Sequence, residues 1–230
     1  MPHEEEHRDI SSGGVRAAVF GIADGLVTNV SLILGFAGAH PSADVVRLAG
    51  LAGLVAGAFS MASGEYISMR AQRELFERDL RVERRALAED PEMETEELVN
   101  NYVSKGMRPE LARQVATDIM QNPELALEVH AREEFGVDPD SLGSPVISAV
   151  SSFLAFAVGA FIPLVPWLIG GGTAAVAWSI GLTAVALLTV GALLGSFTGR
   201  SKVFSALRSL GFAAVAAAVT YAIGHAVGAG

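Results

Sequence analysis

The chain has 230 residues, of which 51% are hydrophobic and 18% are charged, and its mean hydropathy is +0.42. This composition is too apolar for an ordinary soluble domain, and the formal net charge of −9 argues against nucleic acid as a partner. Because the chain has no cysteine, a bound metal ion must be held by carboxylate, imidazole, thioether or backbone oxygen.

Five apolar stretches are each long enough to cross a membrane, which takes about 20 predominantly apolar residues. They cover residues 15–39, 45–69, 146–169, 174–197 and 203–227. We therefore predict an all-α, multi-pass membrane protein with five transmembrane helices in contact with membrane lipid. The first stretch is too long for the core of a signal peptide and is followed by further spans, so we expect the mature protein to retain it.

Polar residues divide the chain into four parts. We expect an N-terminal tail at 1–14, two transmembrane helices at 15–69, a polar helical insert at 70–144 and three transmembrane helices at 145–230. Of the 16 Lys and Arg residues, all but Arg47 fall in or beside the tail, the insert and the loop between the last two spans. Positive charge marks cytosolic loops, so the N-terminus and the insert are predicted to be cytosolic and the C-terminus to lie outside.

The insert is predicted to consist of four helices. Its first residues continue the second span without Gly or Pro, which predicts one long helix that ends near residues 90–91. Thr95 is the predicted N-cap of the next helix, Pro109 and Pro123 begin two more, and Gly136 ends the last. Four such helices can pack as a small bundle.

An aspartate stands inside the first predicted span. An ionisable residue within a span is costly unless it faces a bundle interior or water, so Asp24 is predicted to be functional. The alternative is that Asp24 caps the helix or pairs with a neighbour such as Arg16 near the cytosolic end. In the second span, Met61 and Glu65 are four residues apart and share a helix face at a similar depth. Two carboxylates and a thioether favour a path for a divalent transition-metal ion, although Met61 by itself is more often a packing residue.

The insert offers a second group of candidate metal ligands. Glu94 and Glu97 are three residues apart on one predicted helix, and His130 and Glu134 are four apart on another, so each pair can converge on one ion. Glu83, on the extension of the second span, can approach from a third side. Helical bundles hold iron or manganese with such inward carboxylates and histidines. The alternative is that these glutamates form solvated pairs with arginines one turn away.

Three segments carry a resemblance to a known family. "GIADGLVTN" in the first span, "AGLAGLVAGAFSMASGEYIS" in the second and "LAFAVGAFIPLVPWLI" in the third, together with the acidic helical insert, resemble the vacuolar iron transporter family over nearly the whole chain. The resemblance implies a five-span homodimer that exchanges Fe²⁺, and related ions such as Mn²⁺, against protons. It implies no enzyme activity and no prosthetic group. The membrane would be the cell membrane in a prokaryote and the vacuolar membrane in a eukaryote.

The resemblance also assigns roles to residues in the spans. The family's transport residues in the first two spans match Asp24 and Met61. Plant members carry a further glutamate where this chain has Gly53, and Glu65, three turns later, is a candidate substitute for it.

In the insert, the family's metal-binding positions match most of the residues already singled out. The family's cytosolic glutamates fall on Glu83, Glu94, Glu97 and Glu134, a family methionine falls on His130, and one further glutamate falls on Ala86. The predicted insert site is therefore expected to be weaker than the family's site or differently shaped.

The leading hypothesis is a proton-coupled exporter that moves divalent transition metal out of the cytosol. One alternative is a membrane-anchored carboxylate metalloprotein that oxidises iron, for which a ferritin-like pattern needs Glu-x-x-His on two helices. The sequence has no such repeat. Another alternative is a metal sensor without transport, in which Asp24 would be dispensable.

Overall fold

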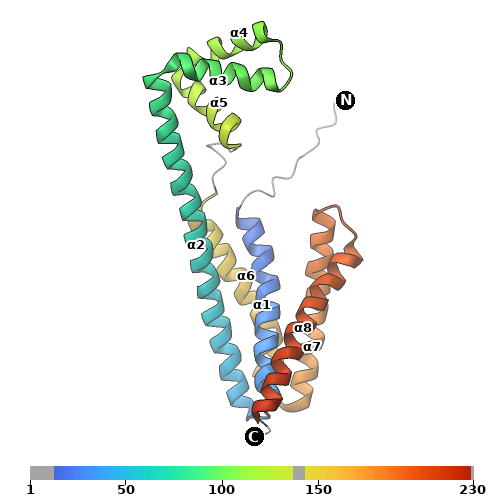
Figure 1. Ribbon diagram of the computed structural model, residues 1–230. Coiled ribbons are helices and arrows are strands. Elements are labelled where there is room, and N and C mark those ends of the chain that lie inside the picture. The colour runs from blue at the N-terminus through green and yellow to red at the C-terminus, as the bar shows by residue number, and fades with distance from the viewer. Residues whose placement is uncertain (1–12, 137–142, 229–230) are drawn as a thin grey trace. The chain divides into compact units, whose positions relative to one another are not determined.

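The computed structural model describes residues 13–136 and 143–228, so most of the predicted tail lies outside the described part. In that part every regular element is an α-helix, as Figure 1 shows. The helices are α1 (Gly13–Gly38), α2 (Ala43–Glu89), α3 (Pro91–Ser104), α4 (Pro109–Met120), α5 (Pro123–Phe135), α6 (Pro145–Ile169), α7 (Gly172–Phe197) and α8 (Lys202–Gly228). Five of them, α1, α2, α6, α7 and α8, are long and apolar enough to cross a membrane. The predicted all-α membrane fold with five spans is confirmed.

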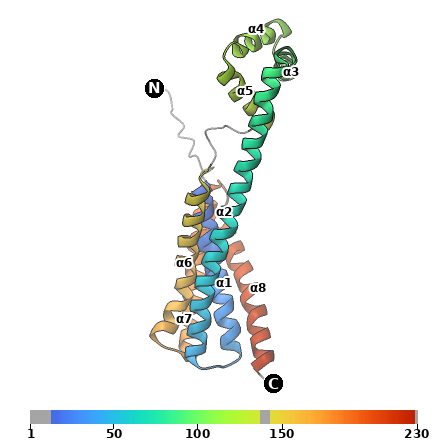
Figure 2. The same cartoon turned by 90° about the vertical axis from the view of Figure 1, so that its left-hand side faces the viewer.

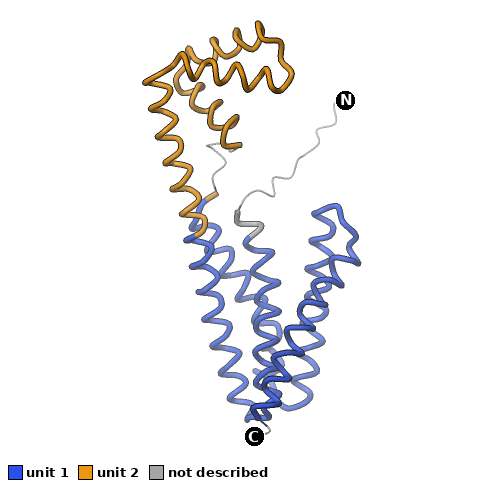
Figure 3. The backbone as a smooth tube through the Cα atoms, in the orientation of Figure 1, with its two compact units in different colours: residues 1–67, 144–230 blue, residues 68–143 orange. Residues whose placement is uncertain are grey.

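The described chain forms two compact units, coloured separately in Figure 3. Unit 1 comprises residues up to 67 and from 144 onward, and therefore holds the membrane-spanning segments. Unit 2 comprises residues 68–143. The helix α2 is continuous to Glu89 and contributes residues to both units, as the absence of Gly and Pro after residue 69 predicted.

Within unit 1, α1 is the central helix and contacts α6, α7 and α8. It runs beside α6 in Figure 1 and again in the perpendicular view of Figure 2. Glycines allow this close approach: a Cβ on Gly25 would overlap the carbonyl oxygen of Phe156, and one on Gly159 would overlap that of Ile22. The backbones of α1 and α6 are thus in direct contact, which is how helices gain packing energy within a membrane.

The C-terminal half of α6 contains two prolines. Pro163 and Pro166 lie inside the helix, which continues to Ile169. Side chains of neighbouring helices bond carbonyls near these prolines, as membrane helices with proline require. Ser179 donates a hydrogen bond to the carbonyl of Pro163 at 2.7 Å, and Arg47 donates to the carbonyl of Trp167 at 2.5 Å.

Arg47, the one Lys or Arg residue outside the three positively charged regions of the sequence, lies near the start of α2. Besides Trp167, it donates to the carbonyl of Gly170 at 3.0 Å, and it forms an ion pair with Asp44 at 2.8 Å. The guanidinium therefore caps the C-terminal carbonyls of α6, where positive charge is favourable.

Unit 2 is a small helical bundle whose helices begin and end at residues that commonly cap helices. Pro109 and Pro123 occupy the first turns of α4 and α5, and Gly136 ends α5 in a left-handed conformation with φ of 63°, as predicted. The start of α3 was predicted wrongly. Asp90 is its N-cap and accepts a hydrogen bond from the Met93 amide, whereas Thr95 lies inside the helix.

The core of unit 2 is formed by small and branched side chains of α3 and α4, namely Leu98, Val99, Ala112 and Ala116. Two long-range ion pairs join its helices: Arg113 of α4 binds Glu96 of α3, and Lys105, just after α3, binds Glu133 of α5. The first pair joins α4 to α3, and the second holds α5, which carries two of the candidate metal ligands, near the end of α3.

Candidate metal centre and transport path

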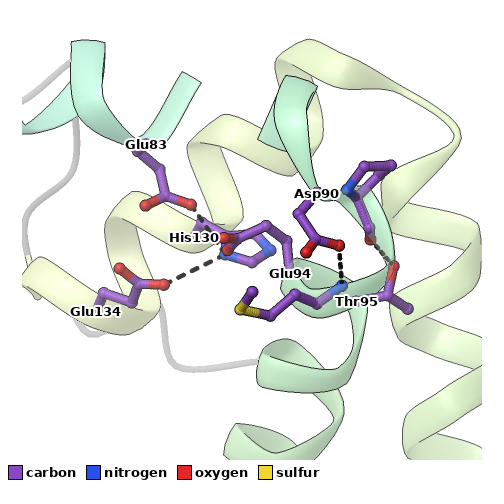
Figure 4. A network of polar contacts seen from close by, with 8 residues as sticks. Glu83, Asp90, Glu94, Thr95, His130 and Glu134 are labelled. Atoms are coloured by element: carbon purple, nitrogen blue, oxygen red, sulfur yellow. Dashed lines mark hydrogen bonds and ion pairs between the residues drawn. The ribbon is translucent and has the colours of Figure 1, made fainter. Parts of the chain in front are cut away.

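Four potential metal ligands converge in unit 2, and Figure 4 shows their side chains pointing toward one another. Glu83 comes from α2, Glu94 from α3, and His130 and Glu134 from α5. One ligand atom from each residue lies within 4.8 Å of the others. Within the described residues this is the only such group of three or more acidic or histidine side chains.

The imidazole of His130 is at the centre of this group. Its Nδ1 lies 3.2 Å from Oε1 of Glu83, 3.3 Å from Oε1 of Glu134 and 3.7 Å from Oε2 of Glu94. One nitrogen can donate only one proton, so it cannot satisfy three carboxylates. The Nε2 atom of His130 is buried and has no hydrogen-bond partner among the described residues. The arrangement therefore leaves acceptor oxygens facing one another, and a cation would relieve their repulsion.

Burial makes this repulsion stronger. Desolvation, followed by the charges of Glu134 and Glu94, raises the pKa of Glu83 from 4.5 to about 7. Desolvation and the charge of Glu97 also raise the pKa of Glu94. A carboxyl group with a pKa near 7, such as that of Glu83, can exchange a proton for a metal ion under physiological conditions.

Local sequence explains which side chains enter the centre. Glu94 and Leu98 are four residues apart on α3, so they share the face that packs into unit 2, and both are buried. On α5, His130 and Glu134 share a face in the same way. The ring of Phe135 packs edge-on against Phe76 of α2, with centroids 6.2 Å apart, which ties the end of α5 to the helix that carries Glu83.

The structure brings together four of the five residues predicted to bind metal in the insert. The exception is Glu97, which is exposed and stands outside the group of four, although its charge acts on both Glu83 and Glu94. Ala86, where the resemblance expects a further glutamate, lies on α2 three residues after Glu83. The centre therefore has three carboxylates and one imidazole as its inner donors.

In unit 1, Asp24 lies near the middle of α1 and is exposed on the surface of the single chain. Its Oδ1 accepts a hydrogen bond from the hydroxyl of Thr28, one turn later, at 3.2 Å. Met61 packs against the apolar cluster formed by Ala58, Phe156 and Ala160, and Glu65 is half-buried one turn after it on α2. A carboxylate exposed in an apolar span needs either water or a further covering surface beside it, because hydrocarbon does not solvate it.

No role was predicted from the sequence for a further polar residue in α1. Asn29 is fully buried, and its Nδ2 donates to the carbonyl of Ala160 on α6 at 2.6 Å. Its Oδ1 accepts no hydrogen bond from any described residue. A Cβ on Gly53 would lie 3.0 Å from that oxygen. The amide oxygen therefore faces the position at which plant members of the family that the sequence resembles carry glutamate. A carboxamide in an otherwise apolar span was the available signal.

Comparison with known proteins agrees with these features. A family profile described as "VIT family" matches residues 15–225. "Vacuolar iron transporter 1" of Tulipa gesneriana is 30% identical over 98% of this chain and 91% of its own length. "Vacuolar iron transporter 2" of Oryza sativa subsp. japonica is 31% identical, over 98% and 92%. "Vacuolar iron transporter" of Acanthamoeba castellanii is 34% identical, over 96% and 82%. With five apolar spans and a profile match over nearly its whole length, the chain belongs to the VIT family.

Proposed function

We propose that this protein moves divalent transition-metal ions, Fe²⁺ in the first place and Mn²⁺ as a related substrate, out of the cytosol in exchange for protons. The observation that carries the proposal is the convergence of Glu83, Glu94, His130 and Glu134 in unit 2 of a protein whose relatives are named vacuolar iron transporters. Mixed carboxylate and imidazole donors suit Fe²⁺ and Mn²⁺. In this proposal unit 2 is a cytosolic domain that collects the ion, and Glu97 adds negative charge at its edge.

The direction of transport follows from the charge pattern. The positive-inside rule supports a cytosolic position for the N-terminus and for unit 2. All Lys and Arg residues except Arg47 lie in or beside the N-terminal tail, the insert and the loop between the last two spans. Arg47 is itself bound to Asp44 and to the end of α6, so it contributes little free positive charge to the opposite side. A metal-collecting domain in the cytosol supports export from the cytosol, either across the cell membrane of a prokaryote or into a vacuole.

Asp24, Met61 and Glu65 form the proposed path through the membrane. Asp24 is exposed in a span whose other residues are mostly apolar, and its only hydrogen bond to a described residue is the one from Thr28. An ionised carboxylate facing lipid would cost at least a few kcal/mol. A second copy of the chain, packed over this face of α1, would remove Asp24 from lipid and place two carboxylates beside one path. We therefore include a homodimer in the proposal.

Proton coupling follows from the same chemistry. Carboxylates bind metal only when they are deprotonated, so each ion that enters displaces protons, and each proton that returns displaces the ion. Glu83, with its pKa raised to about 7, makes this exchange in unit 2, and Asp24 makes it in the span. An iron-oxidising enzyme is not favoured, because the metal centre has a single histidine and the sequence has no repeated Glu-x-x-His motif.

Flux in proteoliposomes tests the proposal. Purified protein should carry Fe²⁺, kept reduced, across the membrane faster when the side that receives the metal is the more acidic one. Collapse of the pH gradient with a protonophore should slow the flux, and Asp24→Ala should abolish it. Flux equal to that of empty liposomes would exclude transport, and flux that ignores the pH gradient would exclude the exchange with protons.

A further inference from the structure

Two histidines from distant parts of the sequence meet at the end of unit 1 where α2 begins. His40 follows α1, and His225 lies in the last turn of α8. Their ring centroids are 6.0 Å apart with an angle of 62° between the ring planes. Both side chains are exposed, and Tyr221, one turn before His225, stacks parallel to its ring with centroids 6.4 Å apart. Neither histidine belongs to the metal centre of unit 2 or to the proposed path.

The backbones that carry these histidines are in direct contact. A Cβ on Gly38 would lie 2.7 Å from the carbonyl oxygen of Tyr221 and 3.1 Å from the amide nitrogen of His225. One turn earlier on α1, Gly35 meets Gly224 so closely that a Cβ on Gly224 would overlap its carbonyl oxygen. The separation of the two histidines is therefore fixed by helix packing, which is the condition for a preorganised pair of ligands.

The conformation of His40 supports the same conclusion. Its φ is 56°, and it is the only non-glycine residue with positive φ in the described chain. Residues that have a β-carbon rarely adopt this left-handed conformation, so the surrounding structure must hold His40 in it. Aromatic packing alone does not require an imidazole at this position. An exposed edge-to-face contact would contribute similarly little to stability if the ring belonged to another aromatic residue.

We propose that His40 and His225 form a bis-imidazole site for a divalent transition-metal ion. Imidazole nitrogens bind such ions at about 2.0–2.1 Å, so two rings that share one ion have centroids roughly 5–6 Å apart. The observed separation of 6.0 Å between the two ring centroids lies at the upper end of this range. Zn²⁺, Fe²⁺, Ni²⁺ and Cu²⁺ suit imidazole, whereas Mg²⁺ and Ca²⁺ do not.

The position of this site gives it a role in release. His40 follows the end of α1, the helix that carries Asp24, and lies away from the end at which α2 enters unit 2. An ion that has passed Asp24 would meet the imidazole pair before reaching open water. This role as an exit site rests on the proposed transport function, whereas the binding of metal by the two histidines does not.

The test uses the full chain in detergent with the other histidines removed. The sequence has five histidines, so the variant His3→Ala, His7→Ala, His130→Gln retains only His40 and His225. Calorimetric titration with Zn²⁺ in the presence of excess Mg²⁺ should show one more ion bound per chain than in the variant that lacks all five histidines. When His40→Ala or His225→Ala is introduced into this triple variant, each should weaken Zn²⁺ binding at least about tenfold, because a chelate needs both rings. Added Tyr221→Phe keeps the stacked ring and should change nothing.

Two results would overturn the site. One is that the triple variant binds no more Zn²⁺ than a chain that lacks all five histidines. The other is that the binding constant for Zn²⁺ stays unchanged when His40 or His225 is replaced by Ala, which would indicate that the two imidazoles bind independently. Size-exclusion chromatography verifies that each variant is folded. Asp24→Ala tests transport separately, so a failed titration removes the histidine site and leaves the proposed transporter standing.

Discussion

Nδ1 of His130 lies 3.2 Å from Oε1 of Glu83, although α3 and α4 separate the two residues in the chain. The imidazole is fully buried and the carboxylate nearly so. This pair joins the helix that continues from the second span to the last helix of unit 2. An ion bound by both residues would therefore link α2 to α5 more firmly than the Phe76–Phe135 contact does alone.

Metal binding by unit 2 should depend steeply on pH between about 5 and 7. Glu83 has a pKa near 7 in the folded protein and 4.5 ordinarily, so the metal-free folded state holds an extra proton in this window. The folded metal-free protein should therefore lose stability as the pH rises from about 4.5 to 7. Metal replaces that proton, so its affinity should rise over the same window and level off above about pH 7.

Titration of the full chain with Mn²⁺ at pH 5.5, 6.5 and 7.5 measures this dependence. The variant Glu83→Gln serves as its control, because an amide has no proton to exchange in this range. Its affinity should be weaker and should vary less with pH than that of the native chain. Equal pH dependence in both proteins would show that Glu83 does not supply the exchanged proton.

Glu83→Gln should also change stability and binding in opposite directions. The amide removes a desolvated charge and its repulsion with Glu94 and Glu134, so thermal unfolding of the metal-free protein at pH 8 should shift upward. Loss of one carboxylate ligand should weaken Mn²⁺ binding by at least about tenfold. The matched control is Glu74→Gln, which alters an exposed glutamate of the same helix that pairs with Arg70 and should leave metal binding unchanged. A lower melting temperature for Glu83→Gln would contradict the repulsion inferred here.

The limits of prediction are visible on α3. The spacing of Glu94 and Glu97 indicated that both could reach one ion, but a three-residue spacing does not say which of the two faces the core. Leu98, one turn after Glu94, marks the buried face, and Glu97 falls on the exposed side. The start of α3 was misjudged for a related reason, since Asp90 before Pro91 is an N-cap signal as strong as Thr95.

The spans were easier to predict than the contacts between them. Length and hydropathy alone mark the five helices, because lipid demands helices of that length. The meeting of His40 with His225, and of Asn29 with Gly53, depends on which helices are neighbours. Apolar spans carry little information on that point, since nearly every face is apolar and the contacts are made by glycines.

The glycines between α1 and α6 should be intolerant of a single methyl group. Gly159→Ala would place a Cβ against the carbonyl of Ile22, which is backbone and cannot rotate away, so α1 and α6 must separate. We expect a loss of about 1–3 kcal/mol in stability and a lower melting temperature in detergent. Gly64→Ala is the matched control, because a Cβ there meets nothing within 4 Å and alanine favours the helix. Equal melting temperatures for the two variants would show that α1 and α6 are not in backbone contact.

The role of Asp24 is tested most sharply beside Thr28, its hydrogen-bond donor at 3.2 Å. Asp24→Asn keeps the size and the hydrogen bond but cannot exchange a proton for a cation, so it should abolish Fe²⁺ and Mn²⁺ flux in proteoliposomes while the protein folds and assembles normally. Thr28→Val removes only the donated bond and should slow both fluxes by less than about tenfold, the equivalent of 1.4 kcal/mol.

Met61→Ala should reduce Fe²⁺ flux more than Mn²⁺ flux, because it deletes the soft thioether and leaves the hard carboxylates in place. Size-exclusion chromatography separates these effects from misfolding. Normal flux through folded Asp24→Asn would make the aspartate structural, and an equal loss of both ions in Met61→Ala would return that methionine to its packing role against Phe156.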